Sequence, residues 1–163
     1  MNNWLLICMV GLPRSGKSTW AREQGFPIVS KDAIRLALHG ERYLQQAEGW
    51  VHTISKTMVH SLFMAGHDTV ILDETNGNYE RRRQWWSGVP WDVKFKVIDT
   101  KEEVCIERAE DDGDEVIIPV IKEKAAKFDR LFGIEKKMVY DPLKSSLAEY
   151  EDKRIKHSPA MQT

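Results

Sequence analysis

Short apolar runs alternate with segments of helical periodicity along most of this chain. The strand-like runs span residues 4–10, 27–30, 69–72 and 92–99. The first run is apolar at every position, which is typical of a strand buried on both faces of a sheet. Between residues 44 and 65 apolar side chains recur every three or four positions, which predicts an amphipathic helix that ends at Gly66. Further helices are predicted over residues 17–24, 32–40, 79–86, 101–110 and 117–132.

This alternation predicts an α/β fold in which helices cover both faces of a parallel sheet. We expect one domain over residues 1–135 and a C-terminal segment over residues 136–163, where prolines interrupt the pattern and charge increases. Residues 158–163 are expected to be disordered. An alternative is that the tail completes the sheet or covers one of its edges, and the pattern alone favours neither.

Composition is ordinary for a soluble globular domain. The 163 residues are 42% hydrophobic and 30% charged, and 24 Lys+Arg against 25 Asp+Glu leave a net charge of −1. This balance argues against a protein that coats nucleic acid by charge alone, but it leaves room for a local basic groove. The longest apolar run is too short to cross a bilayer, and the N-terminus lacks the basic start of a signal peptide. We therefore expect a cytoplasmic protein without a membrane partner, and the oligomeric state stays open.

Residues 11–18 read Gly-Leu-Pro-Arg-Ser-Gly-Lys-Ser, a complete G-x-x-x-x-G-K-[ST] phosphate-binding loop between a predicted strand and a predicted helix. The N–H groups of such a loop surround phosphate oxygens, and the helix that follows favours anions at its N-terminus. Lys17 should reach the β- and γ-phosphates, and the Ser18 hydroxyl should hold Mg²⁺. We therefore predict that the chain binds ATP with Mg²⁺. The predicted ATP-binding residues are Gly11, Leu12, Pro13, Arg14, Ser15, Gly16, Lys17, Ser18 and Thr19.

Two acidic residues follow the predicted strand at residues 69–72. A triphosphate site needs a carboxylate near the metal, at the end of a buried strand beside the loop strand. Asp73 or Glu74 could orient Mg²⁺ there through water, and the position of Glu74 favours it. The alternative is a pair of ordinary solvated acids.

Asp32 and Arg35 emerge after the second predicted strand, where ligands of such sheets bind. Asp32 could accept the proton of a substrate hydroxyl as this hydroxyl attacks the γ-phosphate. It could equally cap the helix that follows, because aspartate does this well. Arg35 lies on the same helix face and could bind a substrate phosphate with two hydrogen bonds, or be an ordinary surface arginine.

The turn after Glu74 offers two more polar candidates. Thr75 and Asn76 could contact the substrate. The basic run at residues 81–83 spans most of a helical turn, so its three arginines cannot all serve one site. Such a run is more often a solvated face.

Three stretches carry a resemblance to a known family. They are residues 11–23, residues 30–35 (Ser-Lys-Asp-Ala-Ile-Arg) and residues 73–82 (Asp-Glu-Thr-Asn-Gly-Asn-Tyr-Glu-Arg-Arg), and a weaker match runs from Arg108 through Pro119. In this order they resemble the kinase domain of bacteriophage polynucleotide 5′-hydroxyl kinases, within the wider P-loop kinases. The resemblance covers about residues 4–132 and implies a P-loop kinase fold with a helical lid.

The resemblance also implies roles for individual residues. The acid that matches Asp32 is the general base, and the arginine that matches Arg35 engages the phosphate next to the accepting 5′-hydroxyl. Residues that match Glu74 and Thr75 line the active site. The implied partners are therefore DNA or RNA ends that carry a 5′-hydroxyl.

This chain departs from the family in its lid. The family places a basic residue of the lid against the transferring phosphate, whereas residues 111–115 here are Asp-Asp-Gly-Asp-Glu. Arg108, at the start of the lid, is the nearby arginine that could replace it as a catalytic residue. The region after Gly40 is also shorter and less basic, and the phosphatase motif often fused to such kinases is absent from this sequence.

Three hypotheses follow. The first is transfer of the γ-phosphate of ATP to the 5′-hydroxyl of DNA or RNA, with Asp32, Lys17 and Arg108 as catalytic residues. The second keeps this chemistry but has a small hydroxylated metabolite or a nucleoside as acceptor, which the near-neutral charge favours slightly. The third is a nucleotide-binding switch without phosphate transfer, for which the acidic lid is the support.

Overall fold

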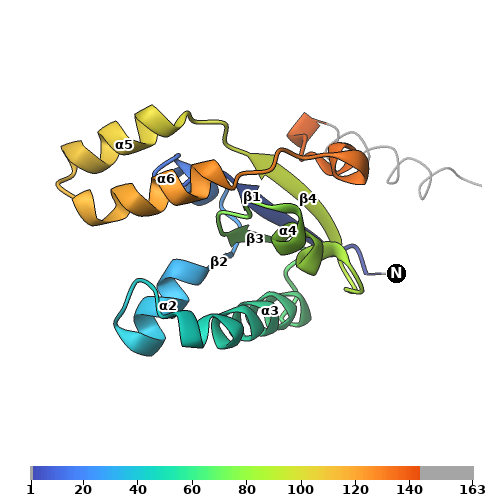
Figure 1. Cartoon of the computed structure of the whole chain (residues 1–163). Coiled ribbons are helices and arrows are strands. Elements are labelled where there is room, and N and C mark those ends of the chain that lie inside the picture. Colours follow the sequence, from blue (N-terminus) through green and yellow to red (C-terminus); the bar gives the residue numbers. More distant parts are fainter. Residues whose placement is uncertain (1, 144–163) are drawn as a thin grey trace, which may run out of the picture.

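Four parallel strands form the centre of the computed structural model, which describes residues 2–143 (Figure 1). The strand order is β2-β3-β1-β4. Their bounds are β1 Leu5–Val10, β2 Ile28–Ser30, β3 Thr69–Asp73 and β4 Asp92–Val97. The predicted parallel α/β sheet is confirmed, and β3, the strand that leads to Asp73 and Glu74, lies beside β1 as predicted.

Helices follow the strands in the predicted order. The α-helices are α1 Lys17–Glu23, α2 Lys31–His39, α3 Glu48–Met64, α4 Tyr79–Trp86, α5 Glu102–Asp111 and α6 Ile118–Ala126. Three short 3₁₀ segments are η1 Gln45–Ala47, η2 Glu115–Ile117 and η3 Gly133–Met138. None of the helices in the part of the chain described by the structure has both the length and the apolar character needed to cross a membrane.

Alternate residues of β1 serve two separate cores. Leu6 and Cys8 pack with Val51 and Phe63 of α3, together with residues of α2 and α4. Ile7 and Met9 face the opposite side, where α1 packs. Because successive strand residues point to opposite faces, a strand buried on both faces must be apolar throughout, which explains the sequence of residues 5–10.

The helices α5 and α6 form a hairpin that packs on the phosphate-loop end of the sheet. Cys105 and Ala109 of α5 and Ile121 of α6 form a small core with Leu12 of the loop. In Figure 1 this hairpin lies on one side of the sheet, and α2 and α3 lie on the other. The hairpin is the predicted helical lid.

The prediction of a helix over residues 117–132 is wrong at its C-terminal end, because α6 ends at Ala126. The backbone beyond it bonds to the turn after β3 instead of continuing a helix. The Asp129 N–H donates to the Gly77 carbonyl at 2.8 Å, and the carbonyls of Asp129 and Arg130 accept from the Arg82 guanidinium. These tertiary partners replace the bonds within a helix.

Arg82 corrects a second expectation, since it does not belong to a solvated face. Its side chain is fully buried and forms a bidentate ion pair with the equally buried Glu135 of η3. Arg81 and Arg83 on either side of it are exposed.

Beyond residue 135 the chain follows the outer edge of the sheet. Val139 forms a parallel bridge with Phe95 of β4, and the Tyr140 N–H donates to the Phe95 carbonyl at 2.9 Å. Residues 139–140 therefore cover an edge of the sheet, which is the alternative that the sequence pattern left open. The domain division at residue 135 stays a prediction, and residues 158–163 lie outside the described residues.

Candidate functional site

The phosphate-binding loop connects β1 to α1 in a conformation that depends on its glycines. Gly16 has φ 102° in the left-handed region, which favours glycine. A Cβ on Gly11 would lie 2.8 Å from both the Ile98 carbonyl oxygen and the Ser15 Oγ, so no larger residue fits there. The Ser15 carbonyl accepts from Thr100 Oγ1 at 2.8 Å. The loop is thus fastened by neighbouring strand ends.

The other predicted loop residues divide into anchors and exposed groups. Leu12 is buried under the lid, Pro13 is half-buried, and Thr19 is exposed in the first turn of α1. The Ser15 Oγ is buried and has no hydrogen-bond partner among the described residues. An unsatisfied buried hydroxyl in a loop of this shape fits a site that receives a polar ligand.

Lys17 is buried, and its Nζ donates to the Leu12 carbonyl at 2.7 Å. Burial lowers the pKa of Lys17, and the negative charges of Asp73 and Asp32 oppose this change. Ser18, the next residue, contacts Asp73 at the end of β3, and Ser30 at the end of β2 is the register partner of Asp73. The phosphate loop, β2 and β3 contribute to one site at the carboxyl edge of the sheet.

The two acids at the end of β3, Asp73 in the strand and Glu74 directly after it, have different partners. The Ser18 Oγ donates to Asp73 Oδ2 at 2.6 Å. Glu74 accepts from Lys31 Nζ at 2.7 Å and from Trp85 Nε1 at 3.1 Å, and its side chain is almost completely buried. This arrangement favours Asp73 over Glu74 as the carboxylate beside a metal on Ser18, which reverses the preference from sequence.

Strand register explains why Lys31 and Glu74 meet. Ser30 of β2 is the register partner of Asp73 of β3, so the residues after them leave the sheet side by side. Sequence reasoning missed this pair because the two residues are 43 positions apart.

Asp32 is an exposed carboxylate in the first turn of α2. The cap of this helix is Ser30, whose Oγ accepts from the Ala33 N–H, so Asp32 is free of the capping role that was left open. Asp32 Oδ1 accepts from Arg35 Nη1 at 2.7 Å, as the shared helix face predicts. Arg35 is also held by both oxygens of Glu48, at 2.7 and 2.8 Å.

Thr75 and Asn76 lie in the turn that fastens the loop. The Thr75 carbonyl accepts from the Gly11 N–H at 3.1 Å. Asn76 is fully buried, and its Nδ2 donates to the Met9 carbonyl at 2.9 Å. No part of its side chain is exposed in this structure, and its contact with a substrate stays a prediction. Asn76 positions the end of β1.

Arg108 reaches the loop from α5. Its Nη1 donates to the Arg14 carbonyl at 3.0 Å and would lie 3.7 Å from a Cβ on Gly16. Two acidic side chains of the lid are held in ion pairs. Asp112 and Asp114 form ion pairs with Arg14, and Asp114 also pairs with Arg42, a residue that carries no motif and that sequence reasoning missed.

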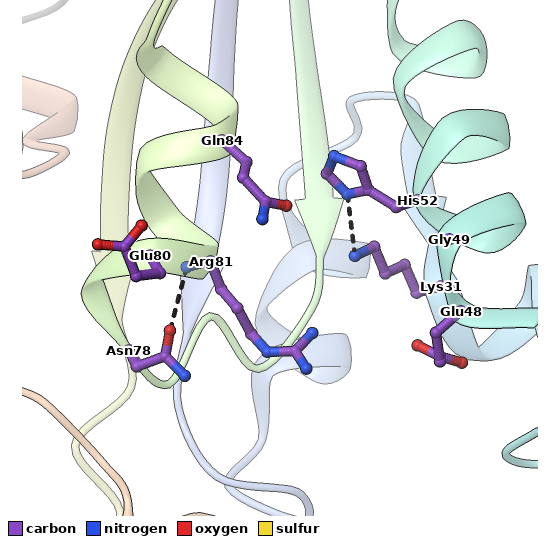
Figure 2. A pocket seen from close by; sticks show the side chains of 8 residues that line it. All are labelled: Lys31, Glu48, Gly49, His52, Asn78, Glu80, Arg81 and Gln84. Atoms are coloured by element: carbon purple, nitrogen blue, oxygen red, sulfur yellow. Dashed lines mark hydrogen bonds between the residues drawn. The ribbon is translucent and has the colours of Figure 1, made fainter. Parts of the chain in front are cut away.

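A polar cavity of about 420 Å³ lies between α3 and α4 beyond β2. Figure 2 shows Arg81 and Gln84 of α4 pointing across it toward Lys31 and His52. The ring of His52 packs edge-on against Trp85 with centroids 5.1 Å apart, and its Nδ1 lies 3.4 Å from Lys31 Nζ. Burial, and next the charge of Lys31, lowers the pKa of His52 to about 4. The cavity is lined by Lys31, Glu48, Gly49, His52, Asn78, Glu80, Arg81 and Gln84.

The whole arrangement from β1 to the end of the lid has a counterpart among known families. The family model described as "AAA domain" matches residues 6–130. The chain belongs to this AAA-domain family. Its fold is that of the P-loop kinases, which implies nucleotide binding, and the place of the nucleotide at residues 11–18 stays a prediction.

Two chains of solved structures support this fold. A chain of the structure "Pnkp1/Rnl/Hen1 complex" is 27% identical with a TM-score of 0.58, over 64% of this AAA-domain chain and 38% of that one. A chain of the "Pnkp1/Rnl/Hen1 RNA repair complex" is 21% identical with a TM-score of 0.58, over 77% and 46%. The AAA-domain chain thus spans less than half of either. A gluconokinase from Sinorhizobium meliloti is 18% identical with a TM-score of 0.48, over 97% and 100%.

Proposed function

We propose that this protein transfers the γ-phosphate of ATP to the 5′-hydroxyl end of DNA or RNA. The observation that carries the proposal is the place of Asp32, an exposed carboxylate in the first turn of α2 that is held by Arg35. Matching motifs around Asp32, Arg35 and residues 73–82, and the likeness to a chain of the Pnkp1/Rnl/Hen1 complex, support a polynucleotide acceptor.

The residues divide the reaction between donor and acceptor sides. On the donor side, Lys17 leaves the Leu12 carbonyl to bind the β- and γ-phosphates. On the acceptor side, Asp32 accepts the proton of the attacking hydroxyl, and Arg35 binds the phosphate next to it. The breaking bond joins the γ-phosphorus to the oxygen that bridges to the β-phosphate, and the new bond joins that phosphorus to the 5′-oxygen.

Ser18 and Asp73 fit a Mg²⁺ site. Mg²⁺ usually keeps several waters and takes one or two protein oxygens together with phosphate oxygens. The Ser18 hydroxyl and the Asp73 carboxylate lie 2.6 Å apart beside the loop and supply these protein oxygens. When bound there, the ion would neutralise charge that develops on the phosphates.

The cavity between α3 and α4 adjoins this acceptor side, since Lys31 precedes Asp32 and Glu48 holds Arg35. Its mixture of charged, amide and imidazole groups suits a nucleoside with several donors and acceptors. We assign it to the 5′-terminal nucleoside of the acceptor.

A small hydroxylated acceptor is the second candidate, and one observation favours it. Glu48 neutralises Arg35 with two hydrogen bonds, and the cavity lining carries as many acidic as basic side chains. A polyanion such as a nucleic acid gains little electrostatic binding energy from such a surface. The binding of an uncharged polyol or nucleoside does not depend on this attraction.

The test is labelled γ-phosphate transfer from ATP with Mg²⁺ to matched DNA and RNA oligonucleotides with 5′-hydroxyl ends, beside nucleosides and polyols. Lys17→Ala should lose transfer, and Asp32→Asn should reduce it about 100-fold or more while ATP still binds. Lys127→Ala, on the exposed end of α6, is the control and should transfer normally. Transfer only to small acceptors would favour the second candidate, and near-normal turnover of Asp32→Asn would remove Asp32 from the mechanism.

A further inference from the structure

Asp114 of the lid is bound by two arginines that come from distant parts of the chain. Its Oδ2 accepts from Arg14 Nη2 at 2.7 Å and from Arg42 Nη2 at 2.7 Å, and its Oδ1 accepts from Arg42 Nη1 at 2.8 Å. Arg14 belongs to the phosphate loop, Arg42 follows α2, and Asp114 lies between α5 and η2. One carboxylate thus connects the lid, the loop and the acceptor side.

The contacts of Asp114 are those that a phosphate group would receive. Guanidinium groups bind carboxylates and phosphates with the same two-pronged geometry, so one anion can replace the other. The Asp114 side chain is only 16% exposed despite its position in a surface turn. Hydrogen bonds from Arg42 and Arg14 hold its pKa far below the ordinary range, so it stays ionised.

The two arginines meet beside the phosphate loop. Arg14 is part of the loop itself, and Arg108 holds its carbonyl. Arg42 shares the Asp114 carboxylate with Arg14, so its guanidinium group lies one carboxylate away from the phosphate loop. Both guanidinium groups are therefore at the edge of the loop that would hold the triphosphate.

A bound triphosphate would also repel the lid carboxylates. Asp112 and Asp114 are ion-paired with Arg14 of the loop. The negative charges of a bound ATP, up to four, would therefore come close to both carboxylates. The ion pairs of Asp112 with Arg14, and of Asp114 with Arg14 and Arg42, would break if the arginines turned to phosphate oxygens.

We propose that Arg14 and Arg42 bind the transferring γ-phosphate, and that Asp114 occupies this arginine pair until the phosphate displaces it. The proposal rests on the proposed function, since it requires a triphosphate donor. It also explains how an acidic lid is compatible with phosphate transfer. The positive charge that meets the γ-phosphate would come from Arg14 in the loop and from Arg42 after α2, and not from the lid.

Binding of a non-hydrolysable ATP analogue and of ADP, both with Mg²⁺, tests this without any acceptor. Calorimetry on the full chain would compare Arg42→Ala, Arg14→Ala and Asp114→Asn with the unaltered protein. Arg42→Ala should weaken the analogue about tenfold while changing ADP little, because a hydrogen bond to a charged group is lost only with the γ-phosphate. Asp114→Asn should tighten the analogue about fivefold, because two partly exposed ion pairs no longer compete.

Asp111→Asn is the matched control, since it removes the same charge from the same lid. No hydrogen bond or ion pair among residues 2–143 joins Asp111 to either arginine, so analogue binding should stay unchanged. Weaker analogue binding in Asp114→Asn, or equal loss of analogue and ADP in Arg42→Ala, would overturn the proposal alone. An unaltered protein that binds neither nucleotide would overturn the proposed function and this inference together.

Discussion

Arg82 of α4 and Glu135 of η3 form a bidentate ion pair with no exposed surface on either side chain, at 2.8 Å between Nε and Oε1 and 3.0 Å between Nη2 and Oε2. Arg82 also donates to the carbonyls of Asn76 and Asp129. The turn that carries Thr75 and fastens the phosphate loop is therefore connected through one guanidinium group to the segment after the lid.

Glu135→Ala should destabilise the protein by about 3–5 kcal/mol, because it leaves the buried Arg82 charge without its partner. Urea unfolding monitored by tryptophan fluorescence measures this. Arg83→Ala, at the exposed neighbour, should change the free energy of unfolding by no more than about 0.5 kcal/mol. Equal stability of the two variants would show that the pair does not hold η3 in place.

Asp73→Asn should raise the Mg²⁺ concentration needed for half-maximal phosphate transfer. The amide oxygen can still accept the hydrogen bond from Ser18, but the negative charge that attracts Mg²⁺ is lost. Glu74→Gln should instead lower the free energy of unfolding by about 3 kcal/mol, because Lys31 loses its buried counter-charge. A Mg²⁺ titration and an unfolding curve for each variant separate the two roles. A raised Mg²⁺ requirement in Glu74→Gln alone would return the metal role to Glu74.

Glu48→Gln should lower KM for a 5′-hydroxyl oligonucleotide about threefold to tenfold, because Arg35 no longer has a charged partner there. The bond from Arg35 lowers the pKa of Glu48, so this competition is present at neutral pH. A nucleoside without phosphate should show no change, and Glu41→Gln, an exposed acid after α2, controls for net charge. An unchanged KM for the oligonucleotide would separate Arg35 from the substrate phosphate.

His52 should make the protein less stable in mild acid. Its pKa is lowered from 6.5 to about 4, mainly by burial. Between these values the unfolded chain binds a proton that the folded protein refuses, so the free energy of unfolding falls as pH falls from 6.5 to 4. Unfolding curves at pH 7 and pH 5 should show a smaller loss in His52→Gln than in the unaltered protein. His39→Gln, at the exposed end of α2, should show the same fall in the free energy of unfolding as the unaltered protein. The same fall in His52→Gln would mean that groups other than His52 cause it.

Local pattern was sufficient for most of the elements and for the loop. The phosphate loop is defined by residues that are close together in the sequence: Gly11, Gly16, Lys17 and Ser18. The apolar run of residues 5–10 directly indicates a strand that is buried on both faces. The helix of residues 117–132 was overestimated because its apolar spacing continues past Ala126, while the backbone there bonds to the turn after β3. Periodicity cannot register a competing tertiary partner.

The sequence by itself determined the phosphate loop, the alternation of strands and helices and the place of Asp32 beside Arg35, because each depends on residues within one or two turns of chain. Only the tertiary structure decided which acid meets Ser18, which arginine of residues 81–83 is buried and what the acidic lid binds. Asp114 meets Arg14 across 100 positions and Arg42 across 72. Such pairs depend on the order of strands in the sheet and on the packing of the lid, which bring distant charges within hydrogen-bond distance and exclude water around some of them.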